Sequence, residues 1–190
     1  RKVTKTGAGA TMLEDPDLAC RIVEAIARAV PLPVTVKMRR GVRDGSRDCL
    51  TVGPLLVGAG ARALTLHPRS ARQMYTGTAD HSLTGELVSL VDVPVIASGD
   101  ITSRARAEAI LATTGASAVM VGRAAQGNPW VLREIARGDT AEPSREEVVA
   151  ELAEHPDLWD FVLGSWEDDS VTSRFGPEGA QEEYVKGLKQ

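Results

Sequence analysis

Four short apolar runs recur along the first two thirds of the chain, separated by segments with helical periodicity. The runs lie near 34–39, 63–67, 94–100 and 118–122. Short runs of this kind are typical of strands, and helices between them favour repeated βαβ units in a parallel sheet. Their spacing of roughly 25–30 residues suits either a doubly wound sheet or part of a (β/α)8 barrel, since four strands are too few to close such a barrel.

The intervening segments predict amphipathic or capped helices. In the first, Asp15 is a suitable N-cap, Pro16 suits the first helical position, and apolar residues recur every four positions from Leu18 to Val30. The second, near 48–59, contains Gly53-Pro54, which we expect to weaken or kink it. Further helices are predicted at 82–91, between the third and fourth runs, at 131–137 and at 143–153.

The pattern changes after Gly138, which predicts two domains, at 1–140 and 141–190. The second begins with a capped helix, because Ser144 and Glu147 have the spacing of a capping box. Beyond it, residues 155–190 are acidic and irregular, and they hold two of the three tryptophans. We therefore expect a helical or irregular tail.

Composition excludes several classes of protein. The chain has 190 residues, of which 43% are hydrophobic and 25% charged, so it is not a disordered chain. A net charge of -4 does not indicate nucleic-acid binding by bulk electrostatics, although a local basic face is compatible with it. No run approaches the roughly 18 apolar residues of a membrane span. Cys20 and Cys49 lack metal-ligand spacing, so we expect a reduced, cytoplasmic protein with no membrane partner and no metal.

Polar groups follow all four predicted strands at the same end. They are Lys37, His67, Ser98-Gly99-Asp100 and Gly122-Arg123. Ligands of parallel α/β folds bind at the carboxyl edge of the sheet, so these groups should converge on one face. We expect the two glycines to let an anion approach the backbone, and Arg123 to pair with a phosphate.

Each of these groups also has a structural interpretation when it is taken alone. A lysine at a strand end can reach solvent, His67 can be a hydrogen-bonded structural residue, and Ser-Gly-Asp can be a turn with a helix cap. Gly122-Arg123 can be a strand end with a surface ion pair, and the arginines of loop 39–47 can form a solvated face. Convergence of all four at one edge favours a ligand site.

Four segments stand out along the chain: VTVKMRRG, ALTLHPRSARQMYTGTAD, VPVIASGDI and AVMVGRAAQGNPW. In this order they resemble the bacterial branch of the tRNA-dihydrouridine synthases, and the resemblance runs from Arg1 to about Ile135. That family consists of FMN enzymes built on a (β/α)8 barrel with a small helical domain. The resemblance implies an α/β fold that is a partial (β/α)8 TIM barrel, formed by its last four strands and followed by a short helical tail.

The resemblance also implies cofactors, substrate and site residues. FMN would be bound by Lys37, His67, Ser98, Gly99, Asp100, Gly122 and Arg123. NADPH would be the reductant, and tRNA would lie near Arg39, Arg69, Arg72 and Tyr75. The complete protein is expected to be a monomer that reduces tRNA uridine to dihydrouridine.

The chain departs from the family pattern in several places. Ser98 stands where asparagine is usual, and His81 replaces a common tryptophan. The family's proton-donating cysteine lies in an N-x-G-C-P motif that would precede Arg1, and Cys20 and Cys49 are expected on outer helices, far from the carboxyl face. We therefore expect an inactive fragment: the carboxyl half of a barrel with an open sheet edge at each end.

Two other functions stay open. The chain could belong to another FMN-binding or phosphate-binding barrel that acts on a small metabolite, or it could be an inactive half-barrel. The HPRSARQMYTG loop and the GNPW segment favour the tRNA enzyme.

Overall fold

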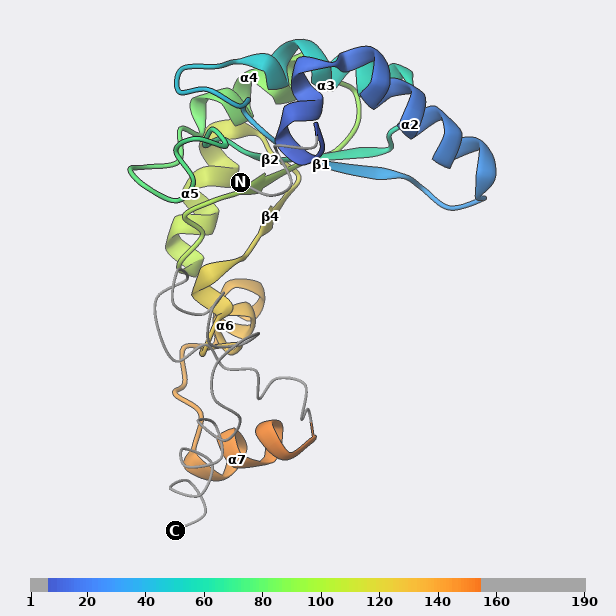
Figure 1. Ribbon diagram of the computed structural model, residues 1–190. Helices are drawn as coiled ribbons and strands as arrows, with labels where there is room; N and C mark the ends of the chain where they lie inside the picture. Colours follow the sequence, from blue (N-terminus) through green and yellow to red (C-terminus); the bar gives the residue numbers. More distant parts are fainter. Residues whose placement is uncertain (1–6, 155–190) are drawn as a thin grey trace, which may run out of the picture.

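The computed structural model describes residues 7–154 and contains one parallel sheet in that range (Figure 1). Its strands pair in the order β1-β2-β3-β4. They are β1 (Thr35–Arg39), β2 (Ala63–His67), β3 (Val95–Ser98) and β4 (Ala118–Met120). All four apolar runs therefore form strands, and the prediction of a parallel sheet is confirmed.

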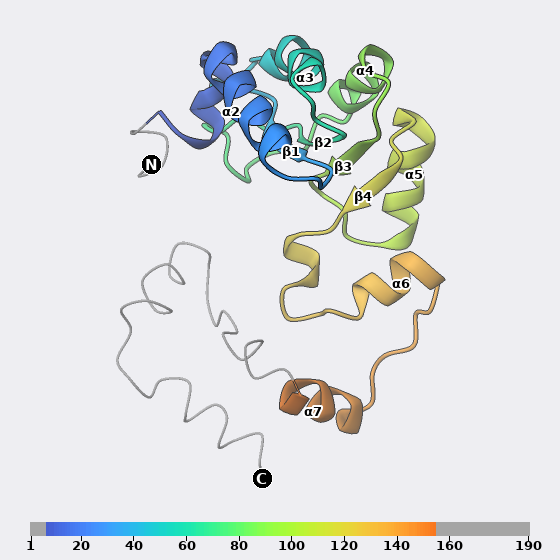
Figure 2. The same ribbon diagram turned by 90° about the vertical axis from the view of Figure 1, so that its right-hand side faces the viewer.

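Four helices cover one face of this sheet. They are α2 (Pro16–Ala29), α3 (Asp48–Gly58), α4 (Ser82–Leu90) and α5 (Arg104–Thr114), and a 3₁₀ helix, η1 (Gly9–Glu14), precedes them. Figures 1 and 2 show the helices side by side on the outside of a curved sheet. Consecutive strand order with every crossover helix on the same face is the arrangement of a (β/α)8 barrel, whereas a doubly wound sheet reverses its order and carries helices on both faces. The fold is therefore α/β and a partial barrel.

The segment after β4 leads away from the sheet. It contains η2 (Arg123–Ala125), α6 (Val131–Arg137) and α7 (Arg145–Glu154). The main-chain nitrogen of Arg104 donates to Glu134 Oε1 at 3.0 Å, which ties α6 to the start of α5. At α7, the hydroxyl of Ser144 and the carboxylate of Glu147 each accept from the other residue's main-chain N–H, so the predicted capping box is confirmed. The tail at 155–190 lies outside the described residues, and the domain boundary near residue 140 stays a prediction.

The core lies between the sheet and the helices. Strand residues that point toward the helices are buried and apolar, whereas the alternate residues point to the concave face. The buried set includes Met38, Leu64, Leu66, Val95 and Ala97. The concave face of the sheet is thus free to carry polar groups.

Helix α3 runs through Gly53-Pro54, although the sequence led us to expect a weakened or kinked helix there. Gly53 has a packing role, because a Cβ at this position would lie 2.7 Å from Leu87 Cδ1. The missing side chain lets α3 pack closely against α4, and this tertiary contact favours the helix despite the two unfavourable residues.

The outer edge of β1 carries an apolar groove of about 470 Å³ between α2 and the strand. Asp15 caps α2 as predicted, accepting from Leu18 N at 3.0 Å. The residues of α2 that are buried are Ala19 and Val23, while Ile22 and Ile26 of its apolar stripe stay 39% and 46% exposed. In residues 7–154, no helix is long and apolar enough to cross a membrane.

Candidate functional site

The polar groups at the strand ends converge as predicted. Arg39 pairs in register with His67, and Ser98 pairs with Met120, so the last residues of all four strands form one layer. Lys37 lies one layer below, level with Thr65. Because side chains alternate along a strand, Lys37 and Arg39 share the concave face. The site is therefore built at the carboxyl edge of the sheet.

Asp100 lies just beyond this layer, two residues after the end of β3. Its Oδ2 accepts from Arg69 Nη2 and from Ala79 N, each at 2.8 Å, and its Oδ1 lies 3.5 Å from Arg123 Nη2. Its backbone is left-handed, with a φ of 55°, which few residues other than glycine adopt. Asp100 thus links the loop after β2 to the turn after β4.

The charge state of Asp100 follows from these contacts. Partial burial alone would raise the pKa of its carboxyl group. The hydrogen bonds from Arg69 and Ala79, together with the charges of Arg69 and Arg123, outweigh that effect and leave the pKa below its ordinary value. Asp100 is therefore a carboxylate at neutral pH, and it cannot act as a proton donor there.

Arg69 is almost completely enclosed, with a side chain that is 2% exposed. Besides Asp100, its guanidinium donates to the carbonyl of Thr76 at 3.1 Å and to that of Gly77 at 2.5 Å. Buried charges are tolerated when they are paired and hydrogen-bonded, and Arg69 meets both conditions. These contacts hold the loop at 68–80 over the edge of the sheet.

Tyr75, in the same loop, lies between two arginines. The guanidinium carbons of Arg39 and Arg123 lie 5.6 Å and 4.8 Å from the centroid of its ring. Arg39 also donates to the carbonyls of Ser70 and Met74, each at 2.9 Å. Cations over an aromatic face are attracted by its quadrupole, so Tyr75 brings the ends of β1 and β4 together.

His67 is buried at the end of β2 and is neutral. Burial is the main cause that lowers its pKa to about 4, and the charges of Arg39, Lys37 and Arg69 add to it. Its Nε2 lies 3.4 Å from Arg69 Nη1. Because a guanidinium can only donate, Nε2 is the acceptor and the ring proton is on Nδ1. His67 can then offer a hydrogen-bond donor without a charge.

Lys37 is a cation of the site without a counter-charge among the described residues. Its ammonium group makes no hydrogen bond or ion pair within residues 7–154. Desolvation lowers its pKa, and the nearby charge of Arg39 lowers it further. An anion beside Lys37 would favour its charged form and offset both effects, so the concave face is suited to a negatively charged ligand.

The two glycines of the site have different roles. A Cβ on Gly122 would meet nothing within 4 Å, so this turn is open to a ligand. Gly99 has a φ of +107°, and a Cβ there would lie 2.7 Å from His67 Cδ2. Gly99 is required by backbone conformation and by His67, whereas the sequence suggested that it leaves room for an anion.

The remaining residues that the sequence predicted for the site do not all lie at its centre. Ser98 lies at the end of β3 and is 9% exposed, whereas the side chain of Arg72 is exposed on the loop. The turn after Gly122 is a 3₁₀ helix of three residues. Of the arginines in the loop at 39–47, only Arg39 reaches the site. Arg40 contacts Ser46 and Asp80, Arg43 contacts Glu14, and Arg47 contacts Glu86.

The two cysteines lie on the outer helices, as the sequence predicted. Cys20 belongs to α2 and Cys49 to α3. Cys49 is fully buried, and its burial raises the pKa of the thiol to about 11. Neither thiol faces the concave side of the sheet. In the described part of the chain, no group of three or more His, Cys, Asp or Glu residues could hold a metal ion.

Sequence reasoning missed how the segment 79–81 supports the site. Ala79 donates its N–H to Asp100, and His81 Nε2 lies 2.9 Å from the carbonyl of Gly99. A carbonyl only accepts, so Nε2 carries the proton and Nδ1 accepts from the hydroxyl of Thr84 at 3.2 Å. The only signal in the sequence for this role was that His81 replaces a tryptophan common in the family that the chain resembles.

Comparisons with known proteins agree with this geometry. The chain is 42% identical to tRNA-dihydrouridine synthase B of Yersinia pestis over 135 residues, which are 71% of this chain and 42% of that protein. It is also 42% identical to the enzyme of the same name from Xanthomonas campestris over 136 residues, 72% of this chain and 41% of that protein. The chain thus spans about two fifths of the length of these curated relatives.

The chain also matches part of a solved structure of nitroalkane oxidase from Streptomyces ansochromogenes. The match covers 52% of this chain and 36% of the oxidase chain, with 25% sequence identity and a TM-score of 0.31. That superposition is too partial to bear on function. The model of the dihydrouridine synthase (Dus) family matches residues 1–157, which include the strands β1 to β4 and the whole candidate site. The chain therefore belongs to the dihydrouridine synthase family.

Proposed function

We propose that this chain forms the cofactor-binding half of a cytoplasmic enzyme that uses FMN and NADPH to reduce uridine in tRNA to dihydrouridine. The observation that carries the proposal is the surplus of positive charge at the carboxyl edge. Four cations, Lys37, Arg39, Arg69 and Arg123, lie at this edge, and of these only Arg69 and Arg123 pair with the carboxylate of Asp100. An anionic cofactor neutralises such a surplus.

The residues present fit a phosphate-bearing flavin. Arg123 is 51% exposed, and it stands beside the open turn at Gly122. A guanidinium next to unobstructed backbone is suited to phosphate. Lys37, one layer deeper and without an anionic partner in the described residues, would face the part of the ring system that becomes negative on reduction.

The remaining residues would orient the reactants. Neutral His67 offers its Nδ1 proton as a hydrogen-bond donor to a carbonyl of the cofactor or of the base. Arg69 and Asp100 hold the loop at 68–80 in place, so Tyr75 and Arg72 stand at the rim where an unstacked uridine would enter. FMN, when bound, would supply the hydride. The cysteines of this chain are placed for no step of the reaction.

The test uses the full-length gene product that contains this chain. The purified protein should carry flavin absorbance, and with NADPH and unmodified tRNA it should add two hydrogens to a uridine, measured by mass spectrometry of digested tRNA. A flavin-loaded protein that leaves tRNA unchanged would overturn the proposal and favour a small metabolite as substrate.

A further inference from the structure

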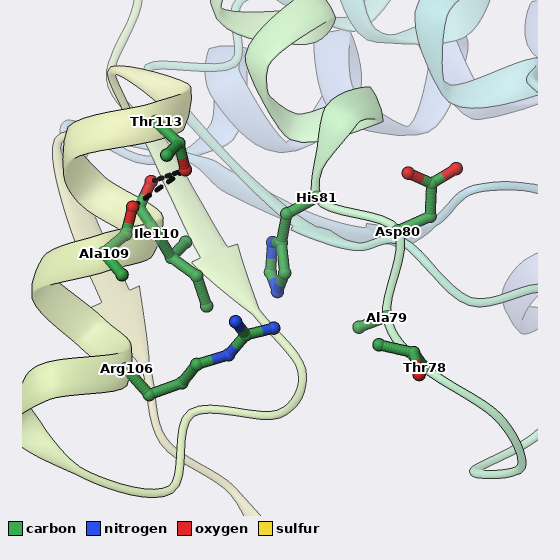
Figure 3. Close-up of a pocket in the computed structure, with 8 residues that line it drawn as sticks. All are labelled: Thr78, Ala79, Asp80, His81, Arg106, Ala109, Ile110 and Thr113. Atoms are coloured by element: carbon green, nitrogen blue, oxygen red, sulfur yellow. Dashed lines mark hydrogen bonds between the residues drawn. The ribbon is translucent and has the colours of Figure 1, made fainter.

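A second cavity lies behind the segment that supports the flavin site. It has a volume of about 450 Å³ and lies between the loop at 78–81 and one face of α5 (Figure 3). Ala79 and His81 form part of its wall, and the same two residues hold Asp100 and Gly99 by hydrogen bonds. The cavity is thus on the outer side of the rim, one layer of residues away from the concave face.

Arg106 is the charged group that enters this cavity. Figure 3 shows its guanidinium extending from α5 toward His81 and Ala79. Its guanidinium makes no hydrogen bond or ion pair with any other residue that the structure describes. The carboxylate of Asp80 points away from it, and that carboxylate is bonded to Ser82 and lies near Arg40.

The position of Arg106 is unfavourable for the helix itself. It lies in the first turn of α5, where the helix dipole repels cations, and this turn has no acidic residue. Arg104 in the same turn is neutralised by Glu108, at 2.7 Å. Arg106 has no such compensation among the described residues, so its charge is available to a ligand.

The other polar groups of the cavity limit what that ligand can be. Burial above all lowers the pKa of His81, and this outweighs the hydrogen bond to the carbonyl of Gly99, which raises it; the charge of Arg106 lowers the pKa further. His81 therefore adds no charge to the cavity. The hydroxyl of Thr113 is bonded to the helix carbonyls of Ala109 and Ile110. The wall between Arg106 and Thr113 is formed by the apolar side chains of Ala109 and Ile110.

We propose that this cavity binds a phosphodiester of the RNA substrate, with the phosphate on Arg106 and the adjoining ribose against Ala109 and Ile110. The inference rests on the proposed function, because it assumes an RNA substrate. A free phosphate ion would use the cation but not the apolar wall, whereas a ribose-phosphate chain uses both. The subsite anchors the RNA outside the barrel mouth, beside the loop that carries Tyr75.

The test measures tRNA binding to the FMN-loaded, full-length gene product over a range of salt concentrations. Arg106→Ala should weaken binding about fivefold to tenfold and lower the slope of log K against log salt by about 1, as expected when one phosphate contact is lost. Arg106→Lys keeps the charge and should keep most of the slope. Arg62→Ala is the matched control, because Arg62 is an exposed arginine at the opposite end of the sheet.

The outcomes separate the subsite from the function. If the unchanged protein binds tRNA and Arg106→Ala behaves like Arg62→Ala, the subsite is wrong and the proposed function stands. If inorganic phosphate binds only to the protein that keeps Arg106, and Arg106→Ala leaves tRNA binding unchanged, the cavity binds a free phosphate ion and the RNA subsite is wrong. If the unchanged protein does not bind tRNA, both the proposed function and the RNA subsite are contradicted. Equal flavin content in all variants excludes misfolding.

Discussion

At the scale of single residues, the site is defined by charge states that burial imposes. His67 is neutral and Asp100 is ionised, although both lie at the carboxyl edge of the sheet. The difference arises because hydrogen bonds and neighbouring cations stabilise the charged form of Asp100. Burial above all, and then the charges of nearby cations, disfavour the charged form of His67. A neutral donor and a fixed carboxylate are therefore held side by side at neutral pH.

His67 should make stability depend on pH. Its folded pKa of about 4 lies below the unfolded value of about 6.5, so the unfolded state binds the proton more readily. The stability gained from neutral His67 is complete above about pH 6.5 and is lost as the pH falls toward 4, with a slope of at most about 1.4 kcal/mol per pH unit. Denaturant titrations should show a steeper dependence of stability on pH in the wild type than in His67→Gln, because the variant lacks the contribution of His67.

The comparison needs its own control, because burial lowers the pKa of His81 as well. His81→Gln should remove a separate part of the pH dependence. Parallel curves for the wild type and His67→Gln between pH 4 and 6.5 would contradict a buried neutral His67.

Arg123 should determine how tightly FMN is held. Replacing it with alanine removes a charge-assisted contact of about 1.5–3 kcal/mol, so the dissociation constant for FMN should rise roughly 10- to 100-fold. Arg123→Lys should lose less, since it keeps the charge but not the planar fork. Flavin fluorescence titration measures the constant, with Arg62→Ala as the control. Equal constants for Arg123→Ala and the control would remove Arg123 from the site.

At the scale of elements, the sequence predicted the strands and the edge at which their polar ends meet, but not how the loop at 68–80 is held. Strand positions follow from local apolar runs. The partners of Arg69 are carbonyls seven and eight residues later and a carboxylate 31 residues later. No periodicity encodes these contacts, and nothing in the sequence marks Asp100 as left-handed.

The loop at 68–80 should loosen when Asp100 loses its charge. Asp100→Asn leaves Arg69 buried without a counter-charge, so we expect about 2–3 kcal/mol of destabilisation, less than for a fully buried pair because Asp100 is partly exposed. Amide hydrogen exchange should speed up in the loop before it does in β2.

Asp92→Asn is the matched control for this change, because Asp92 is exposed and makes no hydrogen bond or ion pair with the described residues. If both variants exchange alike in the loop, the Arg69–Asp100 pair does not hold it.

At the scale of the whole molecule, the structure is an open arc of sheet with helices on its convex side (Figure 2). The period of four in α2 correctly predicted a helix. It could not show that Ile22 and Ile26 would stay partly exposed, since periodicity marks a face of a helix and not the element that covers it. Chain order and strand register place the site at the concave carboxyl edge, and the polar strand ends in the sequence had indicated that position.

The ring of Tyr75, between Arg39 and Arg123, has a consequence for binding. A long, exposed arginine loses conformational entropy when a ligand immobilises it, about 0.5–1.5 kcal/mol for each such side chain. The ring of Tyr75 attracts the guanidinium of Arg123, whose central carbon lies 4.8 Å from the ring centroid, and so restrains this side chain. Arg123 therefore loses part of its freedom when the protein folds, and a phosphate that binds its edge meets a side chain that is already ordered.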